Sequence, residues 1–364
     1  MLISELDTPA LLVDLDIMEA NLSRMAEYCR RHNLRLRPHT KTHKIPELAR
    51  KQIESGAGGI TVAKLSEAEV MIDAGLNDVL IAYPIVGPLK TERLASLAER
   101  ASITVSLDSA EAARGISAAL SGRGTKVAVL VEIDVGFKRC GVSNETEALK
   151  LAQTVSSLPG LNFQGLMFFP GHFGVKPEER AVLRAQVNQL LDRCVETFAS
   201  ADLPIAVMSG GSTPSRYESD QFHGVNETRP GTYIFNDRNT VGVSAAALDE
   251  CALSVLVTVV STSVSDHAVI DGGSKTFSSD RYQAEHGCGF GHIKQDPAAE
   301  IERLTEEHGH INVSQSDRKY TIGERLNVIP NHVCSTVNLH DEIYGVRGER
   351  VETVWRVAAR GKVR

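Results

Sequence analysis

The stretch Leu34-Arg-Leu-Arg-Pro-His-Thr-Lys-Thr-His-Lys44 begins as a short strand and ends in a cluster of basic side chains. Side chains alternate across an extended chain, so a strand that continues past Arg37 would place His39, Lys41 and His43 on one face. Burial between two imidazoles would disfavour the ammonium form of Lys41, and a neutral lysine amine attacks carbonyl carbons. The stretch therefore predicts a Schiff-base lysine at a strand end, and a solvated basic turn is the alternative.

Outward from this stretch, short apolar runs alternate with amphipathic segments. The apolar runs predict strands at residues 34–37, 59–63, 78–82, 103–107, 126–133, 162–168, 204–208 and 232–235. The amphipathic segments predict helices at residues 16–31, 66–74, 91–101, 109–120, 143–157 and 177–200, capped by Asp16, Ser66, Thr91, Ser109 and Ser143. Eight strands alternating with helices predict an α/β fold, a (β/α)8 barrel over residues 12–240, and a doubly wound open sheet is the competing arrangement.

The remaining chain predicts a second domain that is mostly antiparallel β. Its strand-like runs are residues 252–264, 267–271, 310–314, 325–329, 334–338 and 351–357, and helical periodicity is confined to residues 297–308. A hairpin is expected to turn at Arg347-Gly348. We predict that residues 241–364, together with residues 1–11, form this β domain and that it carries a metal site.

Composition excludes several functional classes. The 364 residues are 42% hydrophobic and 23% charged, with a net charge of −7 and no basic domain, so nucleic-acid binding is not expected. No apolar run reaches the length of a membrane span, and the N-terminus lacks a signal-peptide pattern. The six cysteines have no paired spacing, which is typical of reduced thiols. We therefore expect a globular cytoplasmic protein.

Two glycine-containing loops at strand ends predict a phosphate site. Met208-Ser-Gly-Gly-Ser-Thr-Pro-Ser215 follows the seventh predicted strand, and Arg229-Pro-Gly-Thr-Tyr233 flanks the eighth. Bare amides beside small hydroxyls suit an anion, and barrels commonly bind phosphate here. The candidate ligands are Gly210, Gly211, Ser212, Thr213, Gly231, Thr232 and Tyr233. A Walker-type loop is excluded because no lysine follows the glycines, and ordinary turns are the alternative.

Two further strand ends carry cofactor candidates. In Glu132-Ile-Asp-Val-Gly-Phe-Lys-Arg-Cys-Gly-Val142, the guanidinium of Arg139 suits the face or nitrogen of a cofactor ring, and a surface arginine is the alternative. His172, in Pro170-Gly-His-Phe173, suits stacking on such a ring, and a structural histidine is the alternative.

In the second domain, His332 and Cys334 are two residues apart and would point the same way on an extended strand. Imidazole and thiolate together suit zinc, and two protein ligands leave positions open for substrate or water. A chance His-x-Cys pair is the alternative.

Together these residues resemble a known family. The motifs are Asp7-Thr-Pro-Ala10, Arg37-Pro-His-Thr-Lys-Thr-His-Lys44, Gly58-Gly-Ile-Thr-Val-Ala63 with Glu67-Ala-Glu69, Asp271-Gly-Gly-Ser-Lys275 and Pro330-Asn-His-Val-Cys334. They are similar to the D-threonine aldolase / D-serine dehydratase family, pyridoxal-phosphate enzymes of the alanine-racemase-like fold (fold type III). The resemblance implies that Lys41 holds the cofactor, Arg139 faces its pyridine nitrogen, His172 lies near the ring, and the two glycine loops bind its phosphate.

The resemblance also implies that His332 and Cys334 bind a divalent metal, zinc or manganese, and that both contribute to catalysis with Lys41. The implied activity is a lyase acting on D-3-hydroxy-amino acids, in a homodimer. Cysteine at the second metal position is typical of the D-serine dehydratase branch, which favours a 2-oxo acid and ammonia as products. D-threonine aldolase or 3-hydroxyaspartate aldolase activity is the alternative, and an amino-acid racemase on the same fold is a further rival.

Overall fold

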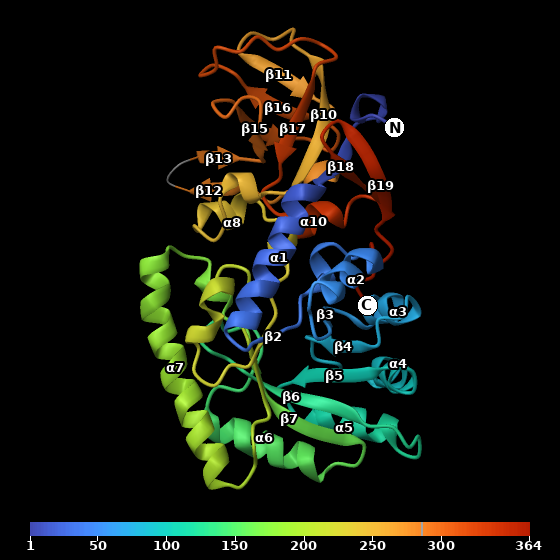
Figure 1. The fold of residues 1–364 in the computed structure, drawn as a ribbon, viewed down its shortest axis with the longest axis vertical. Helices are drawn as coiled ribbons and strands as arrows, with labels where there is room; N and C mark the ends of the chain where they lie inside the picture. Colours follow the sequence, from blue (N-terminus) through green and yellow to red (C-terminus); the bar gives the residue numbers. More distant parts are fainter. Residues whose placement is uncertain (285–286) are drawn as a thin grey trace. The chain divides into compact units, whose positions relative to one another are not determined.

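The computed structural model describes residues 1–284 and 287–364 (Figure 1). The chain divides into two compact units. The barrel unit comprises Arg24–Lys41, Pro46–Gly231 and Lys362–Arg364. The β unit comprises Met1–Ser23, Thr42–Ile45 and Thr232–Gly361.

Eight parallel strands form the sheet of the barrel unit, in the order β2-β9-β8-β7-β6-β5-β4-β3. They are β2 (Arg35–Leu36), β3 (Ile60–Val62), β4 (Asp78–Ile81), β5 (Ser102–Leu107), β6 (Val127–Ile133), β7 (Leu161–Phe168), β8 (Val207–Gly210) and β9 (Glu227–Thr228). The chain around β2 also bonds to the chain around β3, since the amides of Gly58 and Thr61 donate to the carbonyls of Leu36 and Pro38, both at 2.8 Å. The predicted barrel fold is therefore confirmed.

Amphipathic helices cover the outside of this sheet (Figure 1). They are α2 (Pro46–Glu54), α3 (Leu65–Asp73), α4 (Pro88–Ala98), α5 (Ala110–Leu120), α6 (Glu145–Ser157) and α7 (Pro177–Ser200), and α1 (Leu15–Arg31) precedes β2. The core between strands and helices is apolar, with Val105, Val129 and Val131 fully buried. In the part of the chain that the structure describes, no helix is long and apolar enough to cross a membrane.

The helix caps show how local sequence sets the helix starts. Ser109 caps α5 as predicted, accepting the amide of Ala112. Asp14 replaces Asp16 as the acceptor at the start of α1, taking the amide of Ile17 at 3.1 Å. Asn144 replaces Ser143 as the cap of α6. The other two predicted caps lie inside α3 and α4, which begin earlier than predicted.

The eighth strand differs from the prediction. Residues 232–235 do not form a strand, because Thr232–Ile234 is a turn of 3-10 helix. The strand that completes the barrel is β9, whose two residues are both polar. Glu227 is nevertheless buried, because its carboxylate pairs with Arg37 at 2.8 Å. Hydrophobicity alone therefore could not locate this strand.

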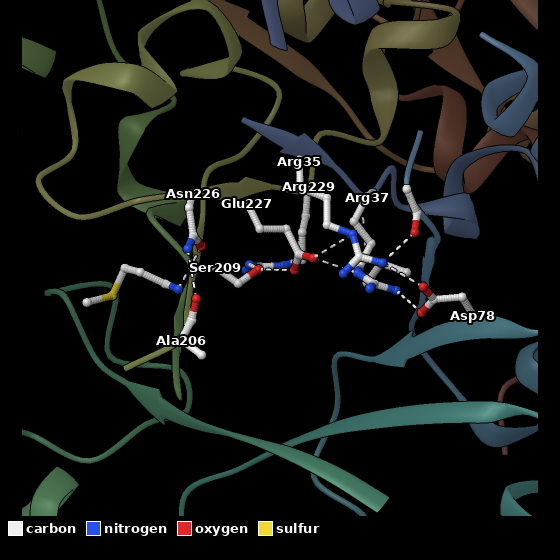
Figure 2. A network of polar contacts seen from close by, with 11 residues as sticks. Arg35, Arg37, Asp78, Ala206, Ser209, Asn226, Glu227 and Arg229 are labelled. Carbon is white, nitrogen blue, oxygen red and sulfur yellow. Dashed lines mark hydrogen bonds and ion pairs between the residues drawn. The ribbon is translucent and has the colours of Figure 1, made fainter. Parts of the chain in front are cut away.

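A row of polar and charged side chains, which we call the charge ladder, runs from the partly exposed Arg35 and Asp78 into the barrel interior (Figure 2). Its members are Arg35, Arg37, Asp78, Ser209, Glu227 and Arg229. Glu227 accepts from Arg37 at 2.8 Å and from the hydroxyl of Ser209 at 2.6 Å. Arg229 donates to Ser209 and, at 2.8 Å, to the carbonyl of Phe168. Burial lowers the pKa of Arg229 to about 10, against the opposing effect of Glu227.

We expect Glu227→Gln to lower the free energy of unfolding by about 3 kcal/mol, because it removes the buried negative charge near Arg229 and leaves Arg37 with Asp78 as its remaining carboxylate partner. Chemical denaturation measures this loss. The matched control is Glu99→Gln, which removes the charge from an exposed pair with Arg123 and should cost at most about 1 kcal/mol. Equal losses in the two variants would contradict the role of the ladder.

The β unit contains a nine-stranded sheet with the main order β15-β16-β11-β10-β1-β18-β19, and β17 pairs with β10 and β14. Its strands are β1 (Ala10–Asp14), β10 (Leu253–Ser261), β11 (His267–Ile270), β14 (His292–Ile293), β15 (Glu300–Leu304), β16 (Gly309–Asn312), β17 (Arg325–Ile329), β18 (Glu342–Arg347) and β19 (Arg350–Arg356). β1 and β18 are parallel, and the other neighbours are antiparallel. A separate pair joins β12 (Tyr282–Ala284) and β13 (Gly287–Gly289).

Two predictions for the β unit are wrong and one is confirmed. Residues 334–338 are not a strand: Val333–Val337 is helix α10, whose first amide donates to the buried carboxylate of Asp237 at 3.1 Å. Residues 297–308 are not a helix, because Ile301 pairs with Ile311 across β15 and β16. The hairpin of β18 and β19 turns between Arg347 and Arg350, as predicted. The two other short helices are α8 (Arg238–Gly242) and α9 (Ser274–Phe277).

Candidate active site

Lys41 lies just beyond β2, at the end of the barrel strands where this fold carries its chemistry. It sits in a turn of 3-10 helix, Thr40–Thr42, so the prediction that His39, Lys41 and His43 share one face of a strand is wrong. The hydroxyl of Thr40 donates to the carbonyl of Thr61 at 3.1 Å, and the amide of Lys41 donates to Nδ1 of His39 at 3.3 Å. These bonds fix the turn that presents the half-buried Lys41.

The loop after β8 has the form of an anion cradle. A Cβ at Gly210 would lie 2.2 Å from the ring of Phe168, and Gly211 has a φ of +107°, so neither position accepts a side chain. Within residues 1–284 and 287–364, the buried amides of Gly211, Ser212 and Thr213 donate no hydrogen bond. Unpaired buried amides at the end of a barrel strand suit a phosphate group.

The loop after β9 joins this cradle through Gly231, whose amide donates to the hydroxyl of Thr213 at 3.2 Å. The next two candidates, Thr232 and Tyr233, belong to the β unit, where Tyr233 is buried. The structure thus brings Gly210, Gly211, Ser212, Thr213 and Gly231 together within the barrel unit.

Arg139 and His172 follow β6 and β7 in the barrel unit. The guanidinium of Arg139 lies 4.3 Å from the centre of the Phe169 ring, and its Nη2 lies 3.6 Å from Oε1 of Glu132. His172 lies in a turn of 3-10 helix, and burial lowers the pKa of its imidazole despite the charge of Asp134. Its Nδ1 is buried without a hydrogen-bond partner in the described part of the chain, which suits a residue completed by a bound cofactor.

His332 and Cys334 lie at the start of α10 in the β unit. They are not on a strand as predicted, but the helix start still brings their side chains together. A hydrogen bond with Cys334 raises the pKa of His332 to about 9, although burial opposes the shift, and Asp237 and Asp280 add to it. Nδ1 of His332 lies 3.4 Å from Oδ2 of Asp280.

Two threonine hydroxyl groups also lie beside Cys334. Its Sγ lies 3.3 Å from Oγ1 of Thr42 and 3.7 Å from Oγ1 of Thr232. The described residues contain no group of three or more histidine, cysteine, aspartate or glutamate side chains placed to hold a metal. A metal on His332 and Cys334 would therefore keep open coordination positions, as catalytic metal sites do.

The predicted site residues thus form two groups, one in each unit. Sequence reasoning missed the carboxylates that accompany them. Glu132 carried a usable signal, because it is a charged residue inside an otherwise apolar strand. Asp280 carried no such signal. It belongs to a polar loop, and its partner His332 is 52 positions away in the chain.

The matches to family models and to known relatives agree with each other. The family model of the alanine racemase N-terminal domain matches residues 13–239, and the serine dehydratase domain model matches residues 252–346. A D-threonine aldolase of Arthrobacter sp is 36% identical over 368 residues, covering 99% of this chain and 94% of that protein. A D-threo-3-hydroxyaspartate dehydratase of Delftia sp. (strain HT23) is 32% identical over 350 residues, covering 91% and 92%.

Solved structures agree with these sequence matches. The crystal structure of a D-threonine aldolase from Filomicrobium marinum superimposes with a TM-score of 0.92 at 35% identity, covering 100% of this chain and 98% of that chain. A variant of D-threo-3-hydroxyaspartate dehydratase, described as being in the metal-free form, gives a TM-score of 0.90 at 29% identity, covering 98% of each chain.

Proposed function

Since the chain belongs to the D-threonine aldolase / D-serine dehydratase family of pyridoxal-phosphate-dependent lyases, we propose that it dehydrates a D-3-hydroxy-amino acid to a 2-oxo acid and ammonia. The observation that carries the choice of dehydration is the presence of cysteine in the His332–Cys334 pair, because the family resemblance implies cysteine at this position in the dehydratase branch. The overall reaction breaks the Cβ–O bond, and water then replaces the amino nitrogen at Cα.

The barrel unit fits pyridoxal phosphate. In the proposal, Lys41 holds the cofactor covalently, and Arg139 and His172 contact its ring. Gly210, Gly211, Ser212 and Thr213, with Gly231, Thr232 and Tyr233, bind its phosphate. The free amides of the cradle and the unpartnered Nδ1 of His172 support this assignment. The cofactor, when bound, supplies a sink for the electron pair left at Cα.

We expect Gly211→Ala to weaken pyridoxal-phosphate binding by about 5- to 150-fold, because the new Cβ would meet the hydroxyl of Thr228 at 2.4 Å and the backbone can relieve about 1–3 kcal/mol of strain only by moving the cradle amides away from the phosphate. Titration of the cofactor-free protein measures this. Gly224→Ala is the matched control, since Gly224 also has a positive φ, +73°, but its Cβ would meet only Val195 at 3.8 Å. Gly224→Ala should lower the free energy of unfolding and leave the dissociation constant of pyridoxal phosphate unchanged. An unchanged constant in Gly211→Ala would contradict the cradle assignment.

His332 and Cys334 are the proposed metal ligands, and zinc or manganese is the expected ion. A divalent ion, when bound there, supplies a Lewis acid for the 3-hydroxyl group of the substrate. The amine of Lys41 is also the proposed base for the α-proton of the substrate. The metal-free structure of a related dehydratase variant supports a metal site in the family.

Retro-aldol cleavage is the second candidate. It is favoured by the 36% identity to a D-threonine aldolase across 94% of that protein. In this case a base takes the proton of the 3-hydroxyl group, the Cα–Cβ bond breaks, and glycine leaves with an aldehyde. The two reactions differ only in which proton is removed and which bond breaks.

We expect D-threonine, mixed with the protein loaded with pyridoxal phosphate and metal, to yield 2-oxobutyrate and ammonia. Product analysis by mass spectrometry distinguishes this result from glycine and acetaldehyde, which would establish the aldolase instead. L-threonine is the control and should give no product. D-serine and 3-hydroxy-D-aspartate, run in parallel, identify the preferred side chain, and interconversion of enantiomers without loss of substrate would establish a racemase.

A further inference from the structure

Glu132, the sixth residue of β6, is a buried carboxylate to which no role is yet assigned. Its side chain is only 3% exposed. Burying a carboxylate is costly unless a counter-charge and hydrogen bonds accompany it. Glu132 receives one long hydrogen bond from the hydroxyl of Ser106, at 3.4 Å, and its closest cation is Arg139, at 3.6 Å.

Three charged residues act on the Glu132 carboxylate. Burial raises the pKa of Glu132, whereas the charges of Arg139 and of the buried Arg229 lower it, and Asp108 raises it further. The carboxylate in turn raises the pKa of the neighbouring Cys140. Glu132 therefore contacts Arg139 and also interacts electrostatically with Arg229, the last member of the charge ladder.

Arg139 needs such a partner. Its side chain is 45% exposed, and an arginine side chain has about 2 kcal/mol of rotamer entropy to lose when it is held in place. The ring of Phe169 restrains the guanidinium plane at 4.3 Å but gives it no polar contact. Glu132 supplies the charged contact that an aromatic ring cannot.

We propose that Glu132 is a positioning residue that holds the guanidinium of Arg139 at the ring nitrogen of the cofactor and connects it to the charge ladder through Arg229. The inference rests on the proposed function, since the contact of Arg139 with the cofactor is part of it. In this proposal Glu132 acts through Arg139, its neighbour at 3.6 Å, and is not assigned a contact of its own with substrate or cofactor.

Removal of the Glu132 carboxylate should lower both the affinity for the cofactor and the pH at which the bound cofactor titrates. Without it, Arg139 is less ordered, so the cofactor loses a preorganised contact and binds more weakly. The region beside the cofactor also becomes more positive, and positive charge favours the deprotonated form of a nearby group. The absorbance of the bound cofactor should therefore titrate at lower pH.

The test compares Glu132→Gln, Glu132→Asp and the control Glu99→Gln, whose exposed pair with Arg123 lies outside the site. We expect Glu132→Gln to bind pyridoxal phosphate about tenfold more weakly and to shift the midpoint of its absorbance titration down by about one pH unit. Glu132→Asp keeps the charge and should restore the midpoint. Glu99→Gln should match the parent protein in both measurements.

A double-mutant cycle with Arg139→Gln separates positioning from general support of the fold. If Glu132 acts through Arg139, then Glu132→Gln adds no further loss of affinity in the Arg139→Gln background. Additive losses, or a lower melting temperature with an unchanged titration midpoint, would overturn the inference. If Glu132→Gln does not fold, Arg139→Gln decides, because parent-like affinity and an unchanged titration midpoint in that variant would leave Glu132 no cofactor contact to act through and would overturn the inference. Failure of the parent protein to bind pyridoxal phosphate overturns the proposed function instead.

Discussion

Lys41→Ala is expected to lose the visible absorbance of the bound cofactor and to lower turnover by about 10⁴-fold. The substitution removes the only atom proposed to bond covalently to pyridoxal phosphate, and it also removes the proposed base for the α-proton. Absorbance spectroscopy of the reconstituted protein measures the first loss, and product formation from the preferred D-3-hydroxy-amino acid measures the second.

Lys64→Ala is the matched control for this result. Lys64 follows β3 at the same end of the barrel, and its ammonium group lies 3.4 Å from the centre of the Tyr83 ring. Its loss should cost about 0.5–1 kcal/mol of stability and leave the absorbance in place. Retention of the absorbance in Lys41→Ala, or its loss in Lys64→Ala, would show that Lys41 does not hold the cofactor.

Removal of the metal by a chelator is expected to abolish turnover and leave the cofactor absorbance unchanged, because the side chains proposed to hold the metal, His332 and Cys334, are not among those proposed to hold the cofactor. Zinc or manganese added back should restore turnover. Cys334→Ala and His332→Ala should each weaken metal binding by more than about 100-fold, since even outer partners of metal ligands contribute 10- to 100-fold. Metal content and cofactor absorbance are measured on the same sample of each variant.

Cys288→Ala is the control for the metal ligands, as another half-buried cysteine of the β unit, paired with Glu300. It should keep both the metal and the turnover. Full turnover of the metal-stripped protein would remove His332 and Cys334 from the mechanism.

The barrel was predictable because its strands are buried on both faces and therefore appear as continuous apolar runs. β6 and β5 were located within a residue of their ends. β9 was missed because an ion pair with Arg37, remote in the chain, compensates the burial of Glu227. The residues around Glu227 in the sequence give no indication that Arg37 is its partner.

The candidate site was predictable by residue type more than by geometry. Lys41 was proposed from its basic surroundings and its role stays a prediction, and a strand was expected where the chain forms a turn of 3-10 helix. His332 and Cys334 were identified by spacing, yet a five-residue helix replaces the expected strand, because the carboxylate of Asp237 accepts the first amide of that helix. Short elements such as these are decided by tertiary contacts, which override local preference.

The charge ladder limits which substitutions this sequence can accept inside the barrel. Glu227 is shared by Arg37 and Ser209, so a neutral replacement at one position leaves an unmatched charge at another. Replacing a whole buried ion pair with apolar side chains of similar volume is often tolerated, whereas removing one partner is not. Accepted substitutions inside this barrel should therefore arise as compensated pairs, and libraries of single variants will show strong epistasis among Arg37, Glu227 and Arg229.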